Sequence, residues 1–234
     1  MRRPLTGGII AAGEGSRLHR GGFAMPKPMV PIAGVPLIES VIRNFCAARI
    51  APLAIIVNEQ ERACVDWVRA RFPGLDVEFI VKTTRSSLES FGEVIARYPG
   101  GRMLVSTVDA WCVETDFVHF VEAAARRPAE ATVLAVTPLV ADEKPLRVSM
   151  TADGRVTDVG GDAGDLVTAG MYLVSERVRT LRVPAGLERL REFLAWLARS
   201  GAPVYGEVIE RVVDVDRAED VALAETLALA GRVS

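Results

Sequence analysis

Cysteine is scarce in this chain, and the few cysteines present form no pattern that suggests a disulfide framework or a metal site. Cys46, Cys64 and Cys112 are odd in number, and no two of them share a C-x-x-C spacing. This argues against disulfides and against a cysteine-based zinc site. A reducing compartment suits such cysteines, so we expect a cytoplasmic protein.

Long apolar runs are also missing. The apolar residues 8–12 follow Arg2 and Arg3, but they are too few for the core of a signal peptide. No stretch approaches the roughly 20 apolar residues that a helix needs to cross a bilayer. We therefore expect neither secretion nor a membrane partner.

An excess of positive charge, which a nucleic-acid-binding protein needs, is absent as well. The formal net charge is -2, so composition gives no reason to expect a nucleic acid as partner. Arginine supplies most of the cations, because lysine occurs only at Lys27, Lys82 and Lys144. A lysine near the opening glycine loop is therefore noticeable.

What the chain does have is an alternation of apolar strands with amphipathic helices. In the first half the expected strands and helices are strands 5–11, 53–57, 77–81 and 103–108, and helices 36–49, 59–72, 86–98 and 115–127. We expect helix 59–72 to turn Ala63, Trp67 and Ala70 inward. Such alternation is typical of βαβ units and predicts a largely parallel sheet.

The second half is more mixed. The pattern predicts strand 131–136, a hairpin over 148–159, strand 166–174, helix 187–200, strand 208–213 and helix 218–230. Length and the lack of a linker-like stretch indicate one domain over 1–234, with the change in pattern falling between a first half over about 1–127 and a second half over about 128–234. The long helix near residue 190 is expected in the core, although a homodimer stays open.

The most informative segment follows the first expected strand. It reads Ala11-Ala12-Gly13-Glu14-Gly15-Ser16-Arg17-Leu18, with Pro26-Lys27-Pro28 close behind. Glycine lets backbone N–H groups approach a ligand closely, and Arg17 and Lys27 add positive charge, so the segment suits a polyphosphate. It is neither a dinucleotide fingerprint, because Leu18 replaces the third glycine, nor the phosphate loop of NTPases.

This segment resembles the signature of the nucleotidyltransferases that make nucleotide sugars and related activated metabolites. The continuation over residues 30–38 also matches that family. Further along, Asp109 after an apolar strand, the strand around Gly170 and Tyr172, and the segment after Val213 resemble later family landmarks in the family's order.

The resemblance implies a three-layer α/β/α, Rossmann-like nucleotidyltransferase fold with a predominantly parallel mixed sheet. It also implies transfer of an NMP group from an NTP to a phosphorylated small molecule, with release of pyrophosphate. In that reaction Arg17 and Lys27 would be catalytic, and Gly170 and Tyr172 would bind the acceptor. Mg²⁺ would be the cofactor, bound by carboxylates of Asp109 and of Asp214 or Asp216. The resemblance thus implies a nucleotide-binding half over about 1–127, and a half over about 128–234 that binds the acceptor and supplies the second metal ligand.

The nucleotide would meet the glycine loop and the start of helix 86–98. The residues expected to bind it are Ala11, Ala12, Gly13, Glu14, Gly15, Ser16, Ser86 and Ser87. Two serines that open a helix also suit N-capping, and this alternative stays open. The Ala11-Ala12-Gly13 form of the loop resembles uridylyl- and cytidylyl-transferring members, which favours UTP or CTP.

Other interpretations exist for the aspartates. An aspartate after a strand, such as Asp109, is commonly a turn or helix-cap residue. Asp216 stands three residues before Glu219 and ahead of an apolar helix, which is the spacing of a capping box. We therefore expect Asp216 to be an N-cap and Asp214 to be the second metal ligand, with the reverse left open.

The chain departs from the hexose-specific members of the family at one place. Those members carry an E-K-P string shortly before the G-x-Y strand, where this chain has residues 159–164 without one. The string Glu143-Lys144-Pro145 stands earlier, ahead of the hairpin, and we expect it to be misplaced for acceptor binding. The acceptor is therefore open among sugar, alditol and aminoalcohol phosphates.

Two functions of other classes compete with this one. A glycosyltransferase can share the fold, but its metal motif is often D-x-D, whereas Asp109 precedes Ala110 and Trp111. A nucleotide-sensing subunit without turnover would keep the loop, yet it could lose a metal ligand. The joint presence of Arg17, Lys27 and the aspartates favours an enzyme.

Overall fold

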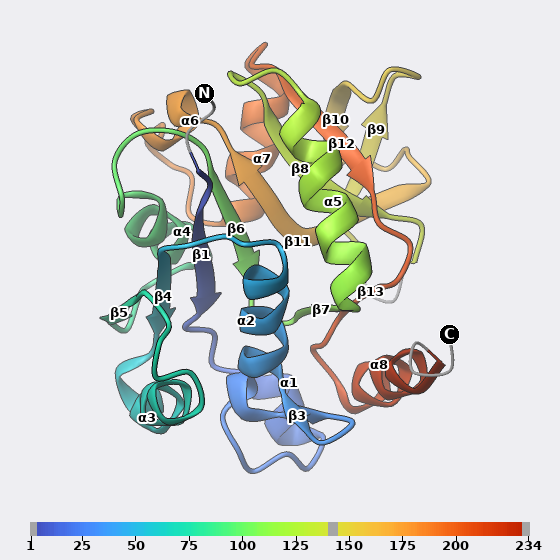
Figure 1. Cartoon of the computed structure of the whole chain (residues 1–234). Coiled ribbons are helices and arrows are strands. Elements are labelled where there is room, and N and C mark those ends of the chain that lie inside the picture. The colour runs from blue at the N-terminus through green and yellow to red at the C-terminus, as the bar shows by residue number, and fades with distance from the viewer. Residues whose placement is uncertain (1–3, 140–144, 231–234) are drawn as a thin grey trace.

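The computed structural model describes residues 4–139 and 145–230 (Figure 1). Within these ranges one sheet contains nine strands: β1 (Thr6–Ala11), β4 (Leu53–Val57), β5 (Val77–Val81), β6 (Met103–Thr107), β8 (Thr132–Thr137), β9 (Arg147–Met150), β10 (Val156–Val159), β11 (Leu166–Val174) and β12 (Val204–Val208). Two small ladders join β2 (Pro31–Ile32) to β3 (Val35–Pro36), and β7 (Ala110–Cys112) to β13 (Val212–Asp214).

Helices connect most of these strands. The α-helices are α1 (Ser16–Arg20), α2 (Leu37–Ala47), α3 (Arg62–Arg71), α4 (Ser87–Ile95), α5 (Glu114–Arg126), α6 (Glu176–Arg179), α7 (Leu190–Arg199) and α8 (Ala218–Ala230). Two short 3₁₀ helices are η1 (Lys27–Met29) and η2 (Glu59–Glu61).

The sheet is parallel on one side and mixed on the other. Strands β5, β4, β1 and β6 lie side by side and run parallel, and β11 then pairs with β6 in the opposite direction. The carboxyl ends of the neighbouring strands β1 and β6 therefore meet at one edge. The glycine loop leaves β1 there, and Asp109 follows β6 at the same edge, where ligands of parallel sheets bind.

Both faces of the sheet are covered, as the alternation of side chains along β1 requires. Ile9 and Ala11 belong to a core shared with α2, α3, α5 and α8, whereas Ile10 points into a second core shared with α4 and α7. Each large apolar side chain buried there contributes about 1.5–3 kcal/mol. The three-layer α/β/α class with a mixed, mainly parallel sheet is therefore confirmed.

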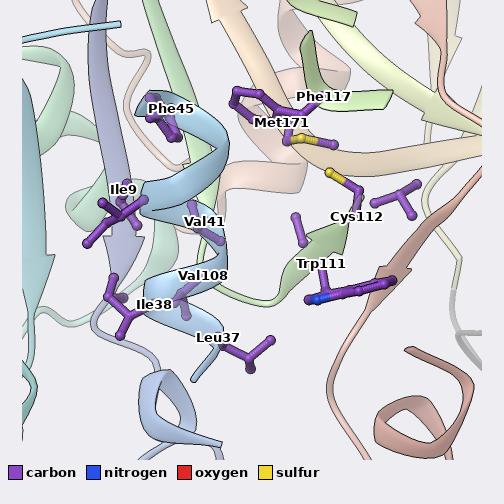
Figure 2. Close-up of a cluster of buried hydrophobic side chains, with 14 of the residues drawn as sticks. Ile9, Leu37, Ile38, Val41, Phe45, Val108, Trp111, Cys112, Phe117 and Met171 are labelled. Atoms are coloured by element: carbon purple, nitrogen blue, oxygen red, sulfur yellow. The ribbon is translucent and has the colours of Figure 1, made fainter. Parts of the chain in front are cut away.

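The first core also fixes the segment that carries Asp109. Figure 2 shows Trp111 and Cys112 of β7 beside the cluster formed by α2 and its neighbours. Phe45 and Phe117 pack there with ring centroids 5.2 Å apart, and Trp111 is 6% exposed. Because β7 is buried in a close-packed core, the residue just before it has little freedom to move.

Two details differ from the prediction. On α3 the buried residues are Cys64, Val65 and Val68, while Trp67 is 41% exposed. The predicted inward face was wrong because two alanines at helical spacing carry little apolar surface, so the opposite face buries more. The strand predicted at 208–213 is also wrong. The chain ends β12 at Val208, and β13 then pairs with β7 instead of with the sheet.

Candidate active site

The glycine loop lies directly against Lys27. Gly15 has a φ of +61°, and a Cβ there would lie 2.8 Å from the Cβ of Lys27. Glycine is therefore required at this position for two reasons: the backbone is left-handed, and Lys27 packs too close for a Cβ. The turn starts helix α1, which carries Arg17 on its exposed surface.

Lys27 is the buried cation of the site. It lies in η1, is 6% exposed, and donates from Nζ to Asp109 Oδ2 at 2.6 Å and to Asp216 Oδ1. Burial alone would lower the pKa of Lys27. The carboxylates of Asp109, Asp216 and Asp214 outweigh that effect and hold the pKa above the ordinary value for lysine. The ammonium group is therefore charged at all physiological pH values.

The β7–β13 ladder brings two aspartates from distant parts of the chain together. Asp214 pairs with Ala110 in this ladder, and the N–H of Val215 donates to the carbonyl oxygen of Asp109 at 3.0 Å. A further bond from the N–H of Trp111 to the same oxygen, at 2.8 Å, closes the turn that holds Asp109. Backbone hydrogen bonds therefore hold the main chains of Asp109 and Asp214 side by side.

Asp109, Asp214 and Asp216 form a cluster of carboxylates, with one oxygen from each lying within 4.8 Å of the others. Burial raises the pKa of Asp109, but the charge and hydrogen bond of Lys27 and a hydrogen bond from Thr107 outweigh burial and hold it below its ordinary value. Three carboxylates at this spacing repel one another unless cations intervene. Their oxygens are the donors that a hard cation such as Mg²⁺ prefers.

Asp216 is not the N-cap that the sequence pattern predicts. Its carboxylate accepts hydrogen bonds from Lys27 and from Arg17, the latter at 3.1 Å. Asp220, in the first turn of α8, instead accepts at Oδ2 from the backbone N–H groups of Asp216 and Arg217, the two residues that precede the helix. Asp216 therefore links both predicted catalytic cations at a single side chain.

A cavity of about 360 Å³ opens beside the carboxylate cluster. All three aspartates line it, as do Gly170 and Tyr172, the two residues predicted to bind the acceptor. Tyr172 is 5% exposed. Burial first, and then the nearby Asp214 and Asp109 carboxylates, raise the pKa of its phenol, so the hydroxyl keeps its proton.

Gly170 allows β11 to pass close to the segment around Asp109. It has a φ of +70°, and a Cβ there would lie 2.6 Å from the hydroxyl oxygen of Thr107 and 2.9 Å from the Cβ of Ala110. Neither distance is tolerable. Glycine at this position therefore lets β11 pack closely against Thr107 and Ala110, which lie on either side of the Asp109 turn.

The predicted nucleotide-binding residues do not all lie in one place. Ser87 lines the cavity, and its hydroxyl accepts from the N–H of Leu190 at 3.1 Å. Ser86 caps α4 by accepting from the N–H of Glu89, which matches the capping alternative. The remaining predicted residues run from the end of β1 to the start of α1 and are not among those that line the cavity: Ala11, Ala12, Gly13, Glu14, Gly15 and Ser16.

Two features of the cavity were missed by the sequence argument. Pro145 lines it next to Leu146. The expectation that the E-K-P string is misplaced for acceptor binding concerns its acidic and basic residues, so it stays a prediction. Glu143 and Lys144 lie outside the described residues. Arg191, near the start of α7, also lines the cavity. No short motif surrounds this arginine, so nothing in the sequence alone distinguished it from the other arginines.

Most of the chain matches a known protein family. Residues 7–197 match the family model described as the MobA-like NTP transferase domain. This chain belongs to that family. The resemblance drawn from the glycine loop is thereby confirmed, because the matched range includes the loop, Asp109, Gly170 and Tyr172.

Several proteins are similar to this NTP transferase domain. The CMP-5'-(3-aminopropyl)phosphonate synthase of Streptomyces rubellomurinus is 27% identical over 211 residues, which is 82% of this chain and 32% of that protein. The bifunctional IPC transferase and DIPP synthase of Rubrobacter xylanophilus is 28% identical over 242 residues, covering 97% of this chain and 53% of that protein. The chain thus spans about a third to a half of the length of these relatives.

A solved structure supports the fold. The inositol-1-phosphate CTP transferase from T. maritima aligns with a TM-score of 0.80 at 16% identity, covering 97% of this chain and 98% of that one. In the described ranges, no helix of the NTP transferase domain combines the length and apolar character that a membrane span would need.

Proposed function

We propose that this chain transfers a nucleotidyl group from a nucleoside triphosphate to a phosphorylated small molecule and releases pyrophosphate. The observation that carries the proposal is the meeting of Lys27, three carboxylates and a cavity at the carboxyl edge of the sheet. We further propose that both halves of residues 1–234 act as one domain, because strands from each half share the sheet.

In this reaction an oxygen of the acceptor's phosphate forms a bond to the α-phosphorus, and the bond from that phosphorus to the β-phosphate oxygen breaks. The two electrons of the broken bond leave with pyrophosphate. Such a displacement needs little covalent help from the protein, so the site acts by positioning and by neutralising charge. Lys27 would neutralise the α-phosphoryl group, and Arg17 would hold the β- and γ-phosphates.

The carboxylate cluster fits Mg²⁺ by the chemistry of its oxygens, so we propose Mg²⁺ as the cofactor, bound by Asp109 with Asp214, Asp216 or both. When bound, the ion would add positive charge next to the phosphates. Lys27 already holds Asp109 and Asp216. The lysine would therefore have to turn towards the α-phosphate as these carboxylates take up the ion.

The remaining roles follow from position. The backbone of the loop 11–16 would face the nucleotide, with Ser86 and Ser87 near its base or ribose, and Gly170 and Tyr172 would contact the acceptor. We propose CTP as the triphosphate, because two of the similar proteins carry CMP or CTP in their names. UTP is the second candidate.

The presence of Arg17, Lys27 and the three carboxylates favours a catalytic enzyme over a subunit that only senses nucleotides. A binding protein needs neither three convergent carboxylates nor a buried lysine held between two of them. A glycosyltransferase remains the weaker alternative, since it has no use for the loop and Lys27.

The test is a pyrophosphate-release screen of the four common NTPs, each with a panel of phosphorylated sugars, polyols, choline and aminoalkylphosphonates. The parent protein should release pyrophosphate with CTP and at least one acceptor when Mg²⁺ is present. Release should stop when EDTA removes the metal.

Two variants complete the screen. Asp109→Asn should lower the rate by about 100-fold or more, because it removes a charge at the centre of the cluster. Asp66→Asn, on the exposed side of α3, is the matched control and should not change it. Pyrophosphate release at the parent rate by Asp109→Asn would refute the proposed site.

A further inference from the structure

The cavity beside the carboxylate cluster has one cationic wall residue, Arg191, among the described residues that line it. All other charged residues of the lining are Asp109, Asp214 and Asp216. Arg191 is the second residue of α7, whose Leu190 and Leu194 form part of the same wall. Its position on the fold is therefore fixed by the packing of this helix.

The start of α7 is held against the start of α4. The N–H of Leu190 donates to the hydroxyl of Ser87 at 3.1 Å, which joins the start of α7 to the start of α4. Leu190 and Leu194 are 6% and 3% exposed. The backbone of the first turn of α7, which carries Arg191, is therefore held in place beside the cavity.

Arg191 is not engaged in an ion pair with any carboxylate of the described ranges, in contrast to Arg17, Arg127 and Arg211, which are. Its guanidinium is close enough to Tyr172 to favour the ionised phenol electrostatically. The exposed guanidinium therefore faces the cavity with hydrogen-bond donors available to a ligand.

The charges of the cluster show why such a cation is needed. The three carboxylates and Lys27 together leave two negative charges, which a single Mg²⁺ would cancel. An acceptor phosphate brings up to about two further negative charges into the same cavity. Without another cation, its approach to the carboxylates would be opposed by repulsion.

We propose that Arg191 receives the phosphate or phosphonate group of the acceptor and holds it for attack on the α-phosphorus. This rests on the proposed function and deepens it, because it names a residue that selects anionic acceptors. The planar guanidinium can donate two parallel hydrogen bonds to such a group. These bonds would orient the phosphate or phosphonate and compensate its negative charge.

The experiment compares Arg191→Gln and Arg191→Lys with the parent and with Arg182→Gln. Arg182 is an exposed arginine outside the cavity lining, so its variant removes the same charge from another part of the surface. Arg191→Gln should raise the KM for the acceptor by about 10- to 100-fold. The KM for the triphosphate should stay within about 2-fold, and the lysine variant should fall between.

A second measurement does not require turnover. Inorganic phosphate, used as the probe, should raise the thermal midpoint of the parent and of Arg182→Gln, but should raise that of Arg191→Gln much less. Unchanged acceptor KM, an equal rise in both KM values, or equal protection by phosphate in Arg191→Gln would overturn the assignment. An inactive parent that still shows the phosphate difference would refute the proposed function while supporting Arg191 as the anion site.

Discussion

Replacing Lys27 by methionine tests the electrostatics of the site more severely than any other single change. Methionine keeps most of the side-chain length and apolar contact but removes the ammonium group. Asp109 and Asp216 then lose the cation that lies between them, and three carboxylates remain within 4.8 Å of one another. The variant should be less stable than the parent in the absence of metal.

The size of the loss can be worked out from the exposure of the partners. Removing one member of a buried ion pair costs about 3–5 kcal/mol. Here the side chains of Asp109 and Asp216 are 21% and 32% exposed, so water screens part of the repulsion. We expect a loss of about 2–3 kcal/mol, which lowers the thermal midpoint of a chain of this size by about 4–12 °C.

The assay is thermal or urea unfolding of Lys27→Met with and without MgCl₂. Because Lys27 competes with a metal ion for Asp109 and Asp216, the variant should bind Mg²⁺ or Mn²⁺ about 10-fold more tightly than the parent when no nucleotide is present. The metal should then recover much of the lost stability in the variant and little in the parent.

Lys82→Met is the matched control, since Lys82 also pairs with two carboxylates, Glu89 and Glu93, but is 41% exposed. Its effect on stability should be much smaller than that of Lys27→Met, because water screens exposed ion pairs, and no metal should rescue it. An unchanged midpoint for Lys27→Met, or equal protection of both variants by Mg²⁺, would show that the reasoning about the cluster is mistaken.

Three further predictions concern other parts of the fold. Gly170→Ala should lower the free energy of unfolding by about 2–4 kcal/mol and lower the activity, because φ is +70° and the new Cβ would meet Thr107 and Ala110. Unfolding and pyrophosphate release measure these effects, and a variant as stable and active as the parent would contradict the prediction. Asp216→Asn should cut pyrophosphate release about 100-fold, since Arg17 and Lys27 both lose a charged partner; a rate within 3-fold of the parent would rule this out. Burial raises the pKa of Glu61 to about 7, so the folded state binds this proton more strongly than the unfolded state, and the stability of the protein should fall as pH rises from about 4.5 to 7. Measured by unfolding, Glu61→Gln should be more stable than the parent by about 2 kcal/mol at pH 8 but not at pH 4. An equal difference at both pH values would exclude this cause.

Much of the fold could be predicted because its signals are local. The alternation of apolar strands with amphipathic helices needs only windows of a few residues, and the bounds of β4, β5, β11 and α8 agree with the structure. Where a helix carries small residues on one side, as α3 does with Ala63 and Ala70, the pattern is too weak to identify the buried face. Trp67 was therefore assigned to the wrong side.

The site was predictable where one short segment carries the chemistry. Gly15, Arg17 and Lys27 stand close together in the sequence, and the structure brings both cations to Asp216. The choice between Asp214 and Asp216 could not be made in this way, because it depends on the β7–β13 ladder between residues about a hundred positions apart. At the start of α8 the carboxylate that accepts backbone hydrogen bonds belongs to Asp220, one residue beyond the Glu219 of the predicted pattern.

Arg191 shows the limit of sequence reasoning for this chain. It is one of many arginines, and its place in the cavity depends on how α7 packs against α4 through Leu190 and Ser87. Only the tertiary arrangement reveals that its guanidinium lies beside the same cavity as the carboxylates.

The most direct test of the account follows CTP and an acceptor phosphate by ³¹P NMR with Mg²⁺ present. The account predicts that pyrophosphate and a new nucleotidyl product with a phosphoanhydride bond form in equal amounts in the parent, and that Asp109→Asn forms both about 100-fold or more slowly. Hydrolysis of the triphosphate to inorganic phosphate without a nucleotidyl product, or product formation by Asp109→Asn at the parent rate, would contradict it.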